Sequence, residues 1–125
     1  MQYIQNSTKS VEEVVKAIKE VAPNHKFGVL SERNMKETLA AKGFDLKEEC
    51  VIIDICNPAV AHTLLTQDPL FSSILPCNIS VCSQNNTTLV IMSSLTQSVD
   101  DINPDFIELA SKTQDTLQTI IKEAI

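Results

Sequence analysis

The sequence has little of what several common classes of protein require. Its 125 residues include no tryptophan, one tyrosine, two glycines and five prolines, which excludes long disordered glycine- or proline-rich tracts. No apolar run approaches the ~20 residues that cross a bilayer, and the first residues lack the basic start and apolar core of a secretion signal. We therefore expect a single domain over residues 1–125, located in the cytoplasm.

Positive charge is also scarce. Sixteen acidic and ten basic side chains give a formal net charge of −6, and Arg33 is the only arginine. Nucleic acids and anionic membranes are bound by clustered lysines and arginines, whereas the basic residues of this chain are scattered. The composition therefore predicts that neither a nucleic acid nor a membrane is a partner.

The four cysteines do not follow the spacing of a common metal or disulfide motif. They are separated by five, twenty and four residues, without a Cys-x-x-Cys segment, and this matches no common zinc site. A disulfide framework is typical of smaller secreted domains that lack a large core. We expect four reduced thiols, no metal site and no catalytic residue, and the sequence names no cofactor.

Capping residues and hydrophobic periodicity predict alternating strands and helices. Ser10 and Glu13 form a capping box before an amphipathic apolar pattern, and Asn57 with Pro58 has the form of a helix start after an alternating strand. In chain order we expect a strand at Tyr3–Ile4, a helix from Ser10 to Ala22, a strand in residues 26–32, a short helix in 34–42, a strand over 50–56, a helix to about Gln67, a hairpin of 75–83 and 87–94, and a long helix from Asn103. This order favours an α+β domain with a mainly antiparallel sheet.

Two short segments place a thiol and an amide at the ends of two predicted strands. They are Cys56-Asn57-Pro58, which ends one strand, and Pro76-Cys77-Asn78, which begins the next. The positive end of a helix dipole beside Cys56 would lower the pKa of its thiol. The alternative is that Cys56 is a small buried residue and that Asn57 and Pro58 only start a helix.

The whole arrangement resembles a known family, the domain of unknown function numbered three hundred and two, found in bacteria and archaea. The resemblance is carried by four segments, and Cys50 and Cys82 lie outside this pattern. It implies a curved, mainly antiparallel sheet with helices packed on one face, like the TATA-binding protein, in a β-α-β(4)-α arrangement with extra short helices. It also implies a homodimer. The segments are Ser10-Val11-Glu12-Glu13-Val14, Phe27-Gly28-Val29-Leu30-Ser31-Glu32, Ile55-Cys56-Asn57-Pro58 and Leu75-Pro76-Cys77-Asn78.

These observations predict a non-enzymatic, homodimeric module that binds a small polar ligand or a partner in a pocket lined by cysteine and asparagine. The expected ligand-binding residues are Asp54, Cys56, Asn57, Pro58, Cys77 and Asn78. The alternative is a thiol redox or soft-metal-binding protein that uses Cys56 and Cys77, provided that the two sulfurs lie close together. A third interpretation treats every cysteine as packing.

Overall fold

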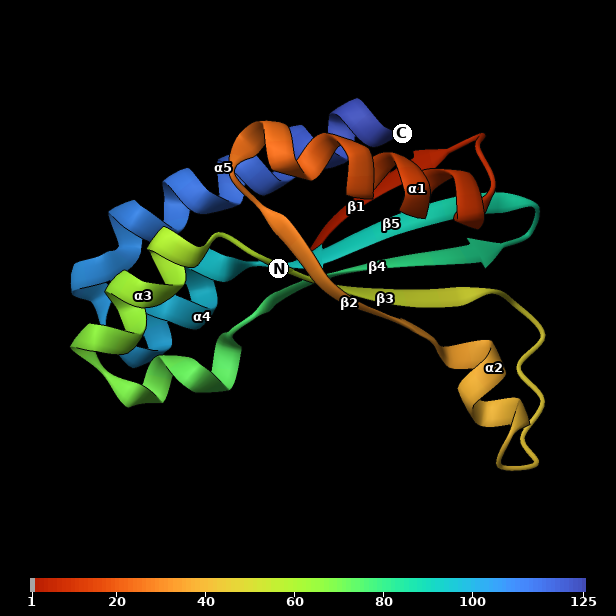
Figure 1. Ribbon diagram of the computed structural model, residues 1–125, viewed down its shortest axis with the longest axis horizontal. Helices are drawn as coiled ribbons and strands as arrows, with labels where there is room; N and C mark the ends of the chain where they lie inside the picture. Colours follow the sequence, from red (N-terminus) through yellow and green to blue (C-terminus); the bar gives the residue numbers. More distant parts are fainter. Residues whose placement is uncertain (1) are drawn as a thin grey trace.

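The computed structural model describes residues 2–125 and contains a five-stranded antiparallel sheet with two helices along one face (Figure 1). The strands lie in the order β1-β5-β4-β3-β2, so β1 and β2 form the two edges. The strands are β1 (Gln2–Ser7), β2 (Gly28–Asn34), β3 (Cys50–Cys56), β4 (Cys77–Gln84) and β5 (Thr87–Ser93). The predicted α+β class and antiparallel sheet are confirmed.

Five α-helices and three short 3-10 helices connect and cover these strands. Helices α1 and α5 lie on the sheet, α2 follows the edge strand β2, and α3 and α4 extend beyond one end of the sheet (Figure 1). The helices are α1 (Val11–Val21), α2 (Met35–Ala40), α3 (Pro58–Gln67), α4 (Leu95–Ile102) and α5 (Ile107–Ala124), with 3-10 turns η1 (Ala22–His25), η2 (Pro69–Ile74) and η3 (Pro104–Phe106). Without the short helices the order is β-α-β(4)-α, as the family resemblance implied.

Local sequence signals fix several element boundaries. Ser10 accepts a hydrogen bond from the Glu13 amide and the Glu13 carboxylate accepts one from the Ser10 amide, which completes the predicted capping box of α1. Asn85 and Asn86 both have positive φ, at 51° and 66°, so they form the tight turn that joins β4 to β5. Asparagine tolerates this conformation well, and the hairpin predicted at this position is present.

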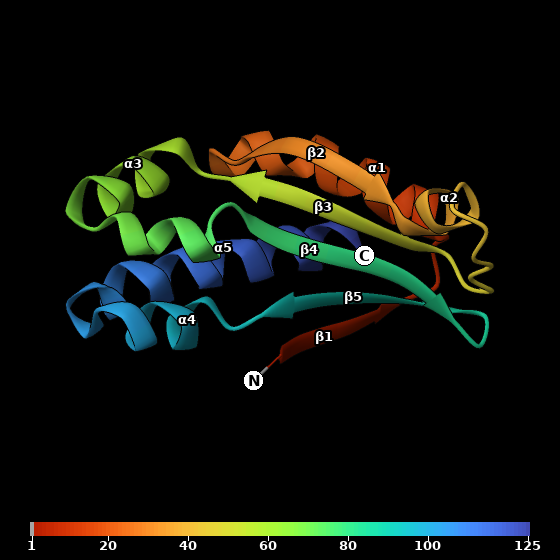
Figure 2. The same ribbon diagram turned by 90° about the horizontal axis from the view of Figure 1, so that it is seen from below.

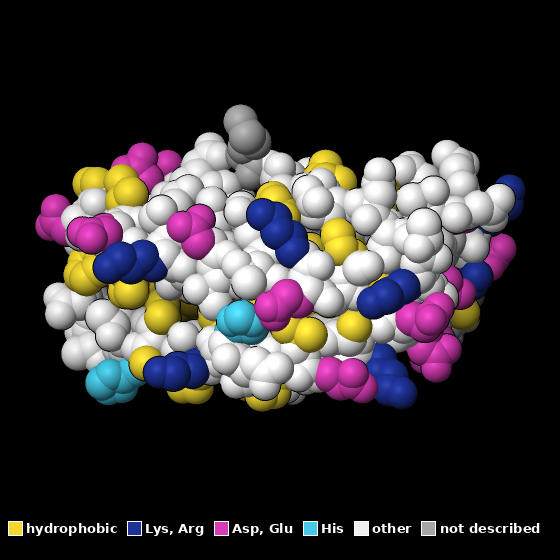
Figure 3. Space-filling view, turned by 90° about the horizontal axis from the view of Figure 1, so that it is seen from above, with side chains coloured by type: hydrophobic (Ala, Val, Ile, Leu, Met, Phe, Trp, Pro, Cys, Tyr) yellow, Lys and Arg dark blue, Asp and Glu magenta, His cyan; other side chains and the backbone are white. Residues whose placement is uncertain are grey.

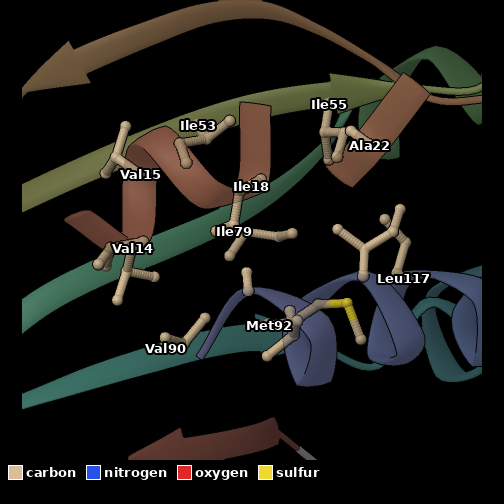
Figure 4. Close-up of a cluster of buried hydrophobic side chains, with 14 of the residues drawn as sticks. Val14, Val15, Ile18, Ala22, Ile53, Ile55, Ile79, Val90, Met92 and Leu117 are labelled. Atoms are coloured by element: carbon tan, nitrogen blue, oxygen red, sulfur yellow. The ribbon is translucent and has the colours of Figure 1, made fainter. Parts of the chain in front are cut away.

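The main core lies between the sheet and helices α1 and α5. Alternation on β3 points one set of side chains toward the helices, and these side chains are buried. Close packing in this layer places α1 over β3 and β4 and α5 over β5 (Figure 4). The cluster includes Val14, Val15, Ile18, Ile53, Ile55, Ile79, Val90, Met92 and Leu117.

A second apolar cluster forms beyond the end of the sheet. It combines residues from the segment between β3 and β4 with residues from α4 and the start of α5. Phe71 and Phe106 contact each other edge to face, with ring centroids 5.6 Å apart. Its fully or nearly fully buried members are Leu64, Phe71, Leu95, Val99 and Ala110. We call this region the helical lobe.

Within residues 2–125 no helix crosses the opposite face of the sheet, and Figure 2 shows the five strands from this side with α1 and α5 behind them. We call it the uncovered face. Ile4 on β1 is 51% exposed there. On β2 the register shifts between Val29 and Ser31, which leaves Leu30 as a bulge residue that is 64% exposed.

Helix α4 was not predicted from the sequence. Its N-cap is Ser94, whose hydroxyl accepts a hydrogen bond from the Gln97 amide. The residues around Ser94 continue the apolar run of β5 and contain neither proline nor glycine, so the change from strand to helix carries no strong signal. In addition, β4 begins at Cys77 and not at Leu75.

Candidate functional site

The structure brings the two predicted segments together at the helical-lobe end of the sheet. Strands β3 and β4 are antiparallel neighbours, with Ile55 paired to Cys77 and Asp54 paired to Asn78. The end of β3 at Cys56 therefore lies beside the start of β4. This proximity is the geometric condition on which the sequence-based site depended.

The register nevertheless divides the predicted residues between the two faces of the sheet. Successive side chains of a strand point to opposite faces, and buried Ile55 points toward the helices. Its partner Cys77 shares that covered face and packs against both apolar clusters. Cys56 belongs to the uncovered face, so the two thiols are not register partners.

Burial raises the pKa of both thiols. The pKa of Cys56 is raised by burial, and the pKa of Cys77 is raised to about 11 by burial first and by the nearby Cys56 second. Sequence reasoning expected the start of α3 to lower the pKa of Cys56, whereas burial of this thiol raises it. At neutral pH the two groups are protonated thiols.

Asp54 already has partners on the uncovered face. Its carboxylate accepts a hydrogen bond of 2.6 Å from the Ser31 hydroxyl and one of 3.2 Å from the Arg33 guanidinium. Both partners come from the edge strand β2, so these contacts join β2 to β3. Asn78 lies opposite Asp54 and is exposed. The carboxylate stabilises the sheet edge in this arrangement.

Asn57 and Pro58 occupy the helix-start positions that the sequence indicated. The Asn57 side chain accepts hydrogen bonds from the amides of Ala59 and Val60, and Pro58 is the first residue of α3. Proline is favourable there because its missing N–H would have no partner inside the helix. The structure thus assigns both residues a local structural role.

A cavity of about 180 Å³ adjoins Cys77 and Asn78 on the covered side. It lies between the start of β4, the end of β5 and the start of α4. Its wall combines apolar side chains with hydroxyl and thiol groups. The lining residues that carry polar atoms are Cys77, Asn78, Ser93, Ser94 and Ser98. We call it the Cys77 cavity.

The first amides of α4, beside the Cys77 cavity, already have acceptors within the protein. The Gln114 side-chain oxygen accepts from the Leu95 amide at 2.8 Å and from the Thr96 amide at 3.3 Å, and Ser94 accepts from Gln97. A helix start with free amides would attract an anion. Because these amides are occupied, the cavity offers neutral donors and acceptors instead.

A smaller hollow of about 150 Å³ shares part of its wall with the Cys77 cavity. Met92, Ser93 and Ser94 line both, and Tyr3 from β1 lines the smaller one. The Tyr3 hydroxyl is buried and has no hydrogen-bond partner within residues 2–125. No sequence signal indicated this unsatisfied group.

A wider groove of about 820 Å³ lies at the other end of the sheet, between α1, the edge strand β2 and the β4–β5 turn. Its volume falls within the range of roughly 300–1,000 Å³ that is typical of ligand pockets. Lys19 and Glu32 form an ion pair in its wall, and Glu12, Lys16, Glu37 and Glu49 add charges of both signs. Sequence reasoning missed this groove, since its charged residues come from three elements and from the segment before β3 and form no motif.

Charge on the helix-covered face is mixed, and acidic and basic side chains alternate over it in small groups (Figure 3). Within residues 2–125, no group of three or more His, Cys, Asp or Glu side chains is placed to hold a metal ion. Over the same residues, none of the helices combines the length and the hydrophobicity that a membrane crossing requires.

Comparison with known proteins identifies the family. The profile of DUF302, a domain of unknown function, matches residues 3–124, and the chain belongs to this family. The crystal structure of an uncharacterised conserved DUF302 protein from Bacillus stearothermophilus is similar, with a TM-score of 0.94 and 28% sequence identity. The match covers 99% of this chain and 98% of that chain. No curated protein matches the sequence.

Proposed function

We propose that the protein is a non-enzymatic, homodimeric module that binds a small, uncharged polar ligand in the Cys77 cavity. The observation that supports this proposal is the position of the cavity, which adjoins the strand end where the sequence placed Cys77 and Asn78. A hollow of about 180 Å³ favours a compact metabolite over a nucleotide, because pockets for larger ligands span roughly 300–1,000 Å³.

The chemistry of the cavity wall favours binding over catalysis. The lining residues include one titratable group, Cys77, whose pKa of about 11 keeps it protonated at neutral pH. General acid–base catalysis needs a group whose pKa lies near the working pH. Hydroxyl groups on an apolar wall instead provide the hydrogen bonds that orient a bound molecule.

A thermal-shift screen of small polar metabolites tests the ligand assignment. The matched variants are Ser98→Leu, which fills part of the cavity, and Gln97→Leu, which places the same side chain on the exposed side of α4. Compounds that raise the Tm of the wild type and of Gln97→Leu but not of Ser98→Leu support the site. Compounds that stabilise all three proteins equally place the ligand elsewhere.

Edge strand β1 is the feature that supports pairing of two copies. Its sequence Gln-Tyr-Ile-Gln-Asn-Ser has no charge and no proline, and all six residues pair with β5 without a register shift. A regular, uncharged edge strand leaves backbone donors and acceptors free to pair with another strand. Edge strand β2 differs, because it carries Glu32, Arg33 and a bulge.

Native mass spectrometry with and without reductant measures subunit number and any adduct together. Ile4→Lys adds a charge to the exposed side of β1, and Leu30→Lys is the matched change on β2. We expect a dimer that Ile4→Lys weakens and Leu30→Lys leaves intact. A monomer at tens of micromolar protein would contradict the dimer, whatever the outcome of the ligand screen.

The alternative of redox or soft-metal chemistry at Cys56 and Cys77 has less support. The two thiols are close enough for Cys56 to raise the pKa of Cys77, but they belong to opposite faces of the sheet. Raised pKa values also reduce the thiolate fraction that attacks disulfides and binds metals. Fast labelling of Cys56 at neutral pH would restore this alternative.

A further inference from the structure

The other end of the β3–β4 ladder holds a second pair of cysteines in direct contact. Cys50 and Cys82 are register partners, and their sulfur atoms lie 3.5 Å apart. The thiol of Cys82 donates a weak hydrogen bond to Cys50 Sγ. Both side chains are partly exposed, and Cys50 shares the uncovered face with Cys56, since the two residues are six apart on one strand.

The backbone around the pair has the geometry that a cross-strand disulfide requires. The Ser83 amide donates to the Glu49 carbonyl at 3.0 Å, which makes Cys50 and Cys82 a non-hydrogen-bonded pair of the ladder. In such pairs the Cα atoms are about 4.5 Å apart, the closer of the two antiparallel spacings. Disulfides span Cα separations of about 4.4–6.8 Å, so the strands need no rearrangement.

We propose that Cys50 and Cys82 are a redox-active dithiol that is oxidised to an intramolecular disulfide by thiol–disulfide exchange with a small disulfide such as oxidised glutathione. Because both side chains are partly exposed, the oxidant can reach them, and because the two sulfurs are in contact, the second thiol is already in place for attack. The proposal is independent of the Cys77 cavity and of the dimer. It also differs from the Cys56 and Cys77 alternative, because it uses the two cysteines outside the family pattern.

The exchange proceeds in two steps that balance. The Cys50 thiolate attacks one sulfur of the external disulfide, forms a mixed disulfide and expels one thiolate of the reagent. Cys82 then loses its proton to solvent, attacks Cys50 Sγ and expels the second thiolate. The protein loses two protons and two electrons, and the reagent is reduced to two thiols.

The hydrogen bond between the sulfurs assigns the order of attack. Cys50 Sγ accepts this bond, so a negative charge on Cys50 has a donor beside it. The pKa of Cys82 is raised to about 12, by burial first and then by its hydrogen bond to Cys50. Cys82 therefore holds its proton longer and acts as the resolving thiol.

The experiment incubates the reduced, native protein with oxidised glutathione, blocks remaining thiols by alkylation and measures the intact mass. After subtraction of the added alkyl groups, we expect a mass about 2 Da below that of the reduced protein, with two alkylated thiols and no retained glutathione. The Cys56→Ser/Cys77→Ser double variant should react in the same way. Cys82→Ser should accumulate a glutathione adduct on Cys50, and Cys50→Ser should react more slowly.

Peptide mapping of the wild type identifies the linked residues without any variant. Trypsin is unsuitable, because no lysine or arginine lies between Lys47 and Lys112. Cleavage before Asp54 and Asp68 separates Cys50 from Cys56 and leaves Cys77 and Cys82 on one peptide, where fragmentation distinguishes them. A bond between Cys50 and Cys82 confirms the proposal. Four free thiols, persistent glutathione adducts without a link, or a bond between other cysteines would overturn it.

Discussion

Each end of the β3–β4 ladder carries two cysteines, but the two pairs differ in geometry. At the helical-lobe end, Cys77 pairs with Ile55, so its neighbour Cys56 faces the other side of the sheet. At the opposite end, Cys50 pairs directly with Cys82 and the sulfurs are in contact. Side chains alternate with a period of two, so a displacement of one residue separates two thiols by the thickness of the sheet. Whether two cysteines on neighbouring strands can form a disulfide therefore depends on the register of the strands more than on the presence of the cysteines.

The largest expected effect comes from a core substitution on β4, between the two ends of the ladder. Ile79 on β4 is fully buried in the main core, whereas Ile91 on β5 is partly exposed on the uncovered face. Ile79→Ala should lower the free energy of unfolding by about 3–4 kcal/mol, since it leaves a cavity in a packed core. Ile91→Ala should cost only about 1 kcal/mol. Urea denaturation measures both, and equal losses would mean that the uncovered face is buried in an assembly.

Oxidation should stabilise the end of the ladder that holds Cys50 and Cys82. A disulfide between residues 32 apart restricts the unfolded chain, and loop-entropy estimates give about 3–4 kcal/mol of added stability. Denaturation of the oxidised protein before and after reduction measures this difference. Cys56→Ser should keep the effect and Cys82→Ser should abolish it, whereas identical curves in both redox states would argue against a bond in the native fold.

High pH should weaken the opposite end through Cys77. The pKa of this thiol is raised to about 11 in the folded protein, from an ordinary value of 9.0. The folded state therefore holds the proton more tightly, and its contribution is present below pH 9 and lost as pH rises toward 11. We expect a loss of about 2 kcal/mol over this interval.

The matched comparison for this prediction is Cys77→Ser, which removes the thiol and keeps a similar volume. Lysines and the tyrosine also titrate above pH 9, so the informative quantity is the difference in pH dependence between wild type and variant. Parallel stability curves between pH 8 and pH 11 would show that the Cys77 thiol is solvated.

The smallest effect concerns the helix start beside Cys56. Asn57→Ala removes the side-chain acceptor for two amides of α3 and should cost about 1 kcal/mol, whereas Asn57→Asp keeps an acceptor. Thermal unfolding of the three proteins measures the difference. Oxidation of Cys50 and Cys82 should be unchanged in Asn57→Ala, because the cap lies at the other end of β3. A changed oxidation rate would mean that the two ends are coupled.

The sequence predicted those parts of the fold that depend on local signals. Alternation marked the buried face of β3, Asn57 and Pro58 marked the start of α3, and the paired asparagines marked the hairpin turn. Each feature follows from residues within a few positions of one another. Helix α4 was missed because its cap, Ser94, looks like any serine at the end of a strand.

The arrangement of the candidate sites could not be read in the same way. The short β4–β5 turn fixes that register locally, but twenty residues separate β3 from β4, and a connection of that length leaves their register open. Whether Cys77 or Asn78 faced Ile55 was therefore undetermined, as was the contact between Cys50 and Cys82. The burial of Cys56 and Cys77 could likewise not be predicted from the sequence, because it depends on packing between elements distant in sequence.

The helical lobe is built by two segments that interrupt the β-α-β(4)-α order. One runs from the end of β3 to the start of β4 and supplies Leu64 and Phe71, and the other runs from β5 into α5 and supplies Val99 and Phe106. Each segment covers apolar side chains of the other. Shortening either one alone would expose its counterpart to water. A relative that lacks one of these segments should therefore lack the other as well, so their lengths should vary together across the family.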